Sequence, residues 1–303
     1  AILQARAGLS GADRLRSRRA AGPRYPGSRM LESARQPAVA GRFYPGEPHR
    51  LELEVRRCLP DPAAALLDAR VVMVPHAGYL YSGAIAGATY ARIRVPASAV
   101  VLCPNHTGLG ARRSLWSGGD WSFPGFSLGI DVDLAQRLLK TEQLTPDELA
   151  HRREHAAEVQ MPFLYARRSD VRVVPICLGR LSLAECRALG VQIGKVIRES
   201  EAATGAGVLM VASTDMSHYV PADTARHYDL RAIDRVLSLD PEGLFEVCER
   251  EGISMCGYIP TTVSLFAARE LSATKAELVR YGNSGEVSGD LAKVVGYAGV
   301  IVH

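Results

Sequence analysis

The stretch VVMVPHAGY, at 71–79, is the part of this sequence from which the fold is most readily predicted. Its four leading apolar residues indicate a short strand that is buried on both faces. Pro75 ends the hydrogen-bonded ladder, and Gly78 allows the backbone to turn. His76 is then left at the carboxyl end of the strand, which is the edge where open α/β sheets bind ligands. The stretch predicts an α/β sheet with an imidazole at its functional edge.

A second stretch, VVLCPNHTG at 100–108, repeats this arrangement and places His106 after another buried strand. Two further polar clusters follow, STDMSHY at 213–219 and SMCGY at 254–258. Two neutral imidazoles with a thiolate or a carboxylate are ligands that suit iron, copper or zinc. A single histidine at a strand end is more often a capping or core-edge residue. The repetition, rather than either histidine alone, therefore favours a metal site.

Other candidate residues have competing interpretations. Asp215 and His218 are three residues apart, so the carboxylate would orient the imidazole as a general base. Cys256 taken alone is typical of a small buried hydrophobic residue. His155 and Glu158 lie at positions i and i+3 of an expected helix. Taken alone, this spacing is typical of a surface pair. The remaining histidines lie in polar sequence surroundings and receive no role: His49, His151, His227 and His303.

Apolar runs alternate with helix-like stretches along the chain. Strands are expected at 71–74, 99–103, 171–177, 208–212, 276–281 and 294–302, and helices near 82–94, 131–140, 154–168, 182–199, 222–237, 241–251 and 260–272. Ser182–Glu185 and Thr145–Glu148 fit capping boxes, and Asp240-Pro241 fits a helix start. Trp116 and Trp121 flank an expected hairpin loop. The alternation predicts an α/β fold: a single domain with a central, mostly parallel sheet flanked by helices.

Charge is distributed unevenly. The chain has 303 residues and a net charge of +4, but residues 1–29 carry seven arginines and one aspartate, which leaves −2 for the remainder. We expect 1–29 to be a disordered leader and 30–303 to be the domain. A transit peptide, or an upstream stretch with Met30 as the true start, explains the leader equally well. A basic footprint for nucleic acid over the domain is excluded.

No apolar run approaches the ~18 residues of a membrane helix, so we expect no membrane partner. Six scattered cysteines without a C-x-x-C pair favour reduced thiols and a cytoplasmic location.

Taken together, the motifs resemble those of Memo-like proteins, which in bacteria and archaea are called AmmeMemoRadiSam system protein B. The resemblance spans about 39–302 and rests on six ordered blocks: PAVAGRFYP at 37–45, PHAGY at 75–79 with YSG at 81–83, PNH at 104–106, Glu154-His155-x-x-Glu158 before Pro162-Phe163, Ser213-Thr214-Asp215-x-x-His218, and Cys256-Gly257.

This resemblance implies a fold similar to class III extradiol dioxygenases, with one deep metal-site pocket. It implies three metal ligands, His76, His106 and Cys256. Asp215 and His218 would lie beside them, and His155 would line the same pocket. In the dioxygenases the third ligand is a glutamate, and a thiolate in its place is softer. Catechol cleavage therefore does not follow from the fold.

The leading hypothesis is a metal-dependent oxidoreductase that binds iron, with copper or zinc possible, and a small-molecule or peptide ligand. His218, steadied by Asp215, would act as its acid or base, with His155 in the same pocket. One alternative is a non-enzymatic adaptor whose pocket captures a peptide or partner protein. Another is a metal hydrolase in which His218 activates water. The family's association with a radical-SAM enzyme also implies partners in a modification pathway.

Overall fold

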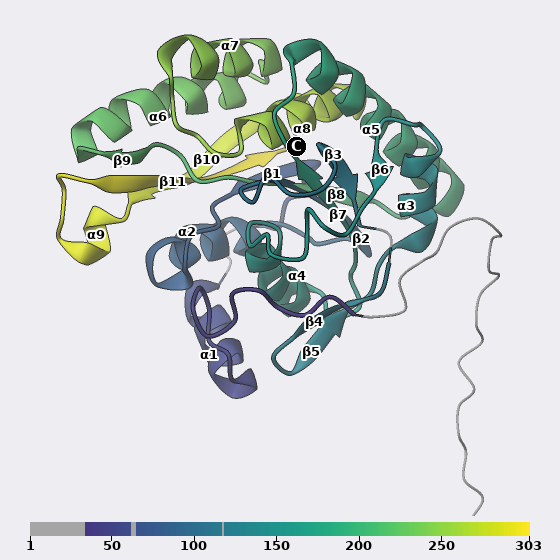
Figure 1. The fold of residues 1–303 in the computed structure, drawn as a ribbon, viewed down its shortest axis with the longest axis horizontal. Coiled ribbons are helices and arrows are strands. Elements are labelled where there is room, and N and C mark those ends of the chain that lie inside the picture. Colours follow the sequence, from purple (N-terminus) through teal and green to yellow (C-terminus); the bar gives the residue numbers. More distant parts are fainter. Residues whose placement is uncertain (1–33, 62–64, 117) are drawn as a thin grey trace, which may run out of the picture.

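One mixed sheet of nine strands runs through the computed structural model, which describes residues 34–61, 65–116 and 118–303 (Figure 1). Along the sheet the order is β10 (Ala276–Asn283), β11 (Val294–Val302), β1 (Val71–Val74), β8 (Val208–Ser213), β2 (Ser98–Pro104), β7 (Arg172–Leu178), β3 (Arg113–Leu115) and β6 (Thr145–Pro146), and β9 (His218–Val220) pairs with β11. All six expected strands are present, and the predicted α/β class is confirmed. The expected leader at 1–29 lies outside the described residues.

The four central strands, β1, β8, β2 and β7, are parallel to one another, and antiparallel strands lie on either side of them. Their residues are almost entirely buried and apolar, because helices cover both faces. In the register of the sheet, Val74 lies opposite Ser213, and Leu102 lies opposite Ala212. The loops that follow β1, β2 and β8 therefore leave the sheet side by side at one edge.

Helices form a layer on each face of this sheet (Figure 1). One layer contains α1 (Pro48–Cys58), α2 (Tyr79–Ala91) and α4 (Met161–Arg167), preceded by the short helix η1 (Glu158–Gln160). The other contains α5 (Leu183–Thr204), α6 (Ala222–Leu237), α7 (Pro241–Glu251) and α8 (Tyr258–Glu270), with α3 (Val132–Leu139) packed beside α5. Gly190 allows α5 and α8 to approach closely, since a Cβ atom there would overlap the Val263 carbonyl.

Two predicted helix starts are confirmed by their caps. Ser182 and Glu185 form a reciprocal capping box at α5, and the Asp240 carboxylate caps α7. The capping box expected at Thr145 is wrong, because Thr145–Pro146 is the short strand β6. The capping side chain is instead Asp147, which accepts the backbone N–H groups of Leu149 and Ala150 and begins a turn in which the N–H groups of His151 and Arg152 donate to the Glu148 carbonyl oxygen.

The expected hairpin between Trp116 and Trp121 is also wrong. β3 pairs with β7, whereas β4 (Trp121–Phe123) pairs with β5 (Phe126–Leu128) through a turn at Gly125, where φ is 85°. Two helices were not predicted: α1, which Glu47 caps, and the short α9 (Gly285–Ser288). Among the described residues no helix has the length and apolar character needed to cross a membrane.

Candidate metal centre

His76, His106 and Cys256 come together at the carboxyl edge of the sheet. His76 follows β1, His106 follows β2, and Cys256 lies just before α8. One side-chain ligand atom from each lies within 4.8 Å of the other two, and the two imidazole ring centres are 5.2 Å apart. Three segments that are distant in the sequence thus place two ring nitrogens and a sulfur around one point.

The hydrogen bonds of Ser213 fix the tautomer of His76. The Ser213 hydroxyl must donate its single proton to the Ala156 carbonyl oxygen (2.7 Å), because a carbonyl can only accept. It therefore accepts from the Gln160 amide (2.8 Å) and from Nδ1 of His76 (3.0 Å). With Nδ1 protonated, Nε2 of the neutral ring carries its lone pair toward Sγ of Cys256, 3.3 Å away. Burial also lowers the pKa of His76, which keeps the ring neutral.

The carboxylate of Glu154 fixes His106 in the same way. Oε1 of Glu154 lies 2.9 Å from Nδ1 of His106, and Oε2 accepts the backbone N–H of His106 at 2.7 Å. Burial would raise the pKa of Glu154, but the bond to His106 and the neighbouring histidines and amides lower it to about 2. Burial would likewise lower the pKa of His106, but Glu154 outweighs it and raises that pKa. Nδ1 of His106 is therefore the donor, and Nε2 is available to a ligand.

Cys256 is held as a thiol beside these rings. Burial raises the pKa of Cys256, with the charge of Asp215 adding to the effect, so the neutral thiol is favoured and a bound cation would favour loss of the proton. The backbone N–H of Asp215 donates to Sγ at 3.2 Å. The following residue, Gly257, donates its N–H to Oγ1 of Thr214 at 2.9 Å. A Cβ atom at Gly257 would overlap Thr214, so glycine is needed to bring Cys256 this close to β8.

The structure places Asp215 and His218 near the centre, but in roles that differ from the expected pair. Oδ1 of Asp215 accepts the backbone N–H groups of His76 (2.7 Å) and Ala77 (3.3 Å), and burial raises the pKa of Asp215. Ser254 orients His218. The backbone N–H of His218 donates to Oγ of Ser254 at 2.8 Å, and Nδ1 of His218 lies 2.9 Å from the Ser254 carbonyl oxygen. A carbonyl can only accept, so Nδ1 of His218 is the donor in this contact.

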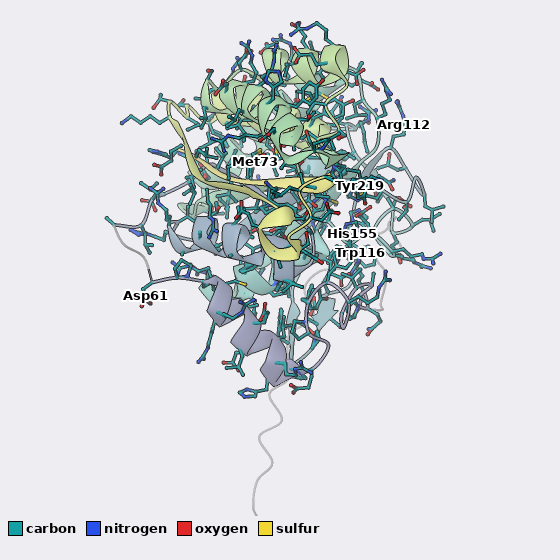
Figure 2. The ribbon with its side chains drawn as sticks, turned by 90° about the vertical axis from the view of Figure 1, so that its left-hand side faces the viewer. Asp61, Met73, Arg112, Trp116, His155 and Tyr219 are labelled. Carbon is teal, nitrogen blue, oxygen red and sulfur yellow. The ribbon has the colours of Figure 1, made fainter. Side chains whose placement is uncertain are left out.

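His155 lies against the two candidate imidazole ligands. Its ring stacks on His106 at 4.7 Å, and Phe43 covers it at 4.8 Å. Burial lowers the pKa of His155 to about 4. In Figure 2 it lies on the same side of the view as Tyr219, which follows His218. The expected surface pair of His155 with Glu158 is wrong, because Glu158 is fully buried and pairs with Arg35 at 2.7 Å.

Three buried residues around the centre were not predicted to have roles. Glu154 belongs to one of the family motifs, but an acidic residue in an expected helix is typical of the helix surface. Arg35 lies over the ring of Trp121 at 4.0 Å and beneath the 151–158 loop. His151, expected in polar surroundings, is fully buried, and neither ring nitrogen finds a hydrogen-bond partner among the described residues. No local pattern distinguishes these three from surface residues.

The donor set fits a transition metal ion. Tetrahedral ligands at ordinary metal–sulfur and metal–nitrogen distances lie about 3.5 Å apart, close to the 3.3 Å between Cys256 Sγ and His76 Nε2. Two imidazoles and a thiolate suit iron, copper and zinc better than magnesium or calcium. Among the described residues a second group has metal-ligand spacing, made of His106, Glu154 and His155, and it shares His106 with the first.

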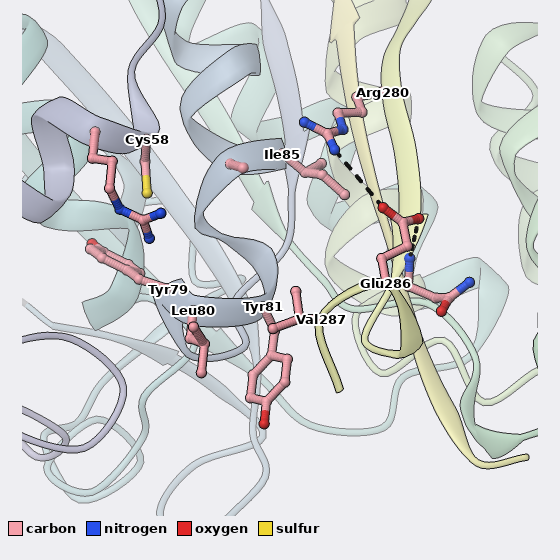
Figure 3. A pocket seen from close by; sticks show the side chains of 11 residues that line it. Cys58, Tyr79, Leu80, Tyr81, Ile85, Arg280, Glu286 and Val287 are labelled. Atoms are coloured by element: carbon pink, nitrogen blue, oxygen red, sulfur yellow. Dashed lines mark hydrogen bonds and ion pairs between the residues drawn. The ribbon is translucent and has the colours of Figure 1, made fainter. Parts of the chain in front are cut away.

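A separate pocket lies between α2, the end of α1 and the segment formed by β10 and α9 (Figure 3). Its volume is about 210 Å³, and its walls include Cys58, Tyr81, Arg280 and Glu286. None of the three candidate metal ligands contributes to these walls. Arg280 faces Glu286 at 3.9 Å, so the cation is already partly neutralised.

Comparisons with known proteins agree with this architecture. The family model described as Memo-like protein matches residues 35–301. A MEMO1 family protein of Methanosarcina barkeri is 41% identical over 269 residues, which are 88% of this chain and 99% of that protein. One of Aquifex aeolicus is 41% identical over 270 residues, 88% of this chain and 98% of its own. The crystal structure of an uncharacterized protein from Escherichia coli K12 has a similar fold, with a TM-score of 0.53 at 15% identity over 75% of this chain and 98% of its own. The chain belongs to the Memo-like protein family.

Proposed function

We propose that His76, His106 and Cys256 bind a transition metal ion and that the protein is a metal-dependent oxidoreductase. Its ligand would be a small molecule or a peptide. The observation that carries the proposal is the convergence of three donor atoms within 4.8 Å, two of them ring nitrogens whose lone pairs are set by hydrogen bonds. The buried His76 needs no deprotonation or tautomer change before it binds a cation, and Glu154 fixes the same Nδ1–H tautomer in His106.

Iron is the first candidate, copper the second, and zinc is also compatible with the ligands. The thiolate of Cys256 makes the set softer than two histidines and a carboxylate, which favours copper(I), zinc or thiolate-bound iron. A bound iron or copper ion would supply one-electron redox chemistry at this position.

The surrounding residues supply proton transfer and positioning. Nε2 of His218 is free to accept or donate a proton, because Nδ1 is bonded to the Ser254 carbonyl. His155 is kept neutral by burial and lies against His106, where it would contact a bound ligand. Asp215 holds the backbone of His76 and so fixes the loop that carries the first ligand.

Metal analysis after anaerobic exposure to Fe(II) or Cu(I) tests the proposal. We expect about one ion per chain in the wild type and none in His76→Ala/His106→Ala. The matched control is His49→Ala/His227→Ala, which removes two exposed histidines and should bind metal like the wild type. A wild type that stays metal-free after this treatment would contradict the proposal.

Oxygen consumption by the iron-loaded protein distinguishes the oxidoreductase from other uses of the same site. An oxidoreductase that uses oxygen consumes it in the presence of an oxidisable ligand, whereas a metal hydrolase or a non-catalytic binding protein does not. The assay needs freshly reconstituted protein, because a thiolate that faces oxygen is itself oxidised.

A further inference from the structure

Glu154 is a buried carboxylate directly behind the ring of His106, in contact with that ligand but not aimed at the metal position. It is 1% exposed. Oε1 accepts from Nδ1 of His106 and from the backbone N–H groups of His155 and Ala156, all at 2.9 Å. Oε2 accepts the backbone N–H of His106 at 2.7 Å. One side chain thus joins the loop after β2 to the 154–156 segment.

These contacts argue against Glu154 as a metal ligand in its own right. Four N–H donors already occupy its two oxygens, and a cation placed there would face those same donors. The carboxylate instead orients the imidazole. A histidine ligand whose second nitrogen donates to a carboxylate is fixed in tautomer and ring orientation and is a stronger electron donor.

The two candidate imidazole ligands differ in this respect. His76 donates to a neutral hydroxyl, that of Ser213, whereas His106 donates to an ionised carboxylate. The ring of His106 is also the less enclosed of the two, with 33% of its side chain exposed. A partly exposed ring has more freedom to rotate, so His106 depends more on its partner for a fixed orientation.

We propose that Glu154 is a positioning residue that holds His106 in its Nδ1–H tautomer and thereby sets the metal affinity of the centre. The inference rests on the proposed function for its metal part only. The hold on the His106 ring exists in the metal-free protein and can be measured there.

The first test compares zinc affinity in variants of two buried glutamates that are four residues apart in the sequence. Glu154→Gln keeps the shape but removes the charge, and its amide must place N–H donors against existing donors. Glu158→Gln is the control, since Glu158 bonds Arg35 and Tyr44 but neither metal-site histidine. By competition with a chelator, we expect zinc binding 10–100-fold weaker in Glu154→Gln, roughly the loss seen on removing such partners. Glu158→Gln should stay close to wild type.

The second test is the tautomer of His106 in the metal-free protein, from ¹⁵N NMR of labelled imidazoles. At a pH where the ring is neutral, we expect a single Nδ1–H form in the wild type and a mixture with the Nε2–H form in Glu154→Gln. Glu154→Asp, which keeps the charge but withdraws it by one methylene, should fall between them. It also provides a folded comparison if the Gln variant does not fold.

Three outcomes overturn the proposal or part of it. An unchanged tautomer and unchanged zinc affinity in Glu154→Gln would refute the role of Glu154. Equal losses of affinity in Glu154→Gln and Glu158→Gln would show that loop packing, not the carboxylate contact, is responsible. A wild type that binds no zinc while its His106 tautomer depends on Glu154 would overturn the metal function and retain the positioning role.

Discussion

Replacing Arg35 by Met tests how firmly the segment before α1 holds the loop that carries Glu154. Arg35 is 3% exposed, and its guanidinium donates to the Glu158 carboxylate (2.7 Å) and to the carbonyl oxygens of His151 (2.9 Å) and Glu154 (2.6 Å). Met lacks the guanidinium, whose Cζ lies over the Trp121 ring, and reaches only about as far as Nε of Arg35. The substitution therefore removes the charge, the donors and the contact with Trp121.

The expected cost is about 3–5 kcal/mol, the usual penalty for removing one partner of a buried ion pair. Glu158 keeps three other donors, from Ala38, Val39 and Tyr44, so its charge is not left wholly uncompensated. This places the estimate toward the lower end, at about 3 kcal/mol. The two carbonyl acceptors that lose their partner would add roughly 1 kcal/mol each if water cannot replace it.

Urea unfolding at neutral pH, followed by tryptophan fluorescence, measures this loss of stability. The ring of Trp121 lies against Arg35, and the ring centre of Trp116 is 6.0 Å from that of Trp121. The fluorescence of these tryptophans therefore reports on this region. Arg56→Met is the control, because Arg56 pairs with Glu52 on the exposed face of α1 and should cost under about 1 kcal/mol. A loss below about 1 kcal/mol for Arg35→Met would refute the argument from burial.

Three further predictions concern acid stability, packing and the amino-terminal segment. Burial lowers the pKa of His151 in the folded protein to about 3, whereas in the unfolded chain it is about 6.5. As the pH falls from about 6.5 toward 3, the unfolded chain binds this proton first, and the free energy of unfolding decreases by up to about 1.4 kcal/mol per pH unit. In His151→Phe the unfolding free energy should depend less steeply on pH between 6.5 and 4; an unchanged slope would contradict the assignment. Gly257→Ala should cost about 1–3 kcal/mol in urea unfolding and weaken metal binding, since the new Cβ overlaps Thr214 and displaces Cys256. Wild-type zinc affinity in this variant would count against the placement of Cys256. Deleting residues 1–29 should leave metal content unchanged, because the family match begins at residue 35, and metal loss on deletion would show that the segment contributes to the site.

The features that could be predicted from the sequence are those that a few neighbouring residues determine. The apolar run at 71–74, followed by Pro75 and His76, predicted both the strand and its functional end. Because the central strands are parallel, the same reasoning placed His106 at that edge. The local signal at Thr145 failed, since Thr145 and Pro146 pair with β3, and Asp147 accepts the first backbone donors of the turn that follows.

Long-range partners could not be predicted in this way. Glu154 is 48 residues from His106, and Arg35 is 123 residues from Glu158. An acidic residue in a polar stretch is normally solvated, and only the folded chain shows that these two carboxylates are buried and paired. The candidate metal ligands were inferred from family motifs, whereas the groups that orient them required the structure.

A crystal structure of the protein grown with iron or copper, with anomalous data at the metal edge, tests the central claim most directly. The account predicts one strong peak about 2.0–2.4 Å from Nε2 of His76, Nε2 of His106 and Sγ of Cys256. A peak bound instead between Glu154 and His155, or no peak beside these three ligands in metal-loaded crystals, would contradict it.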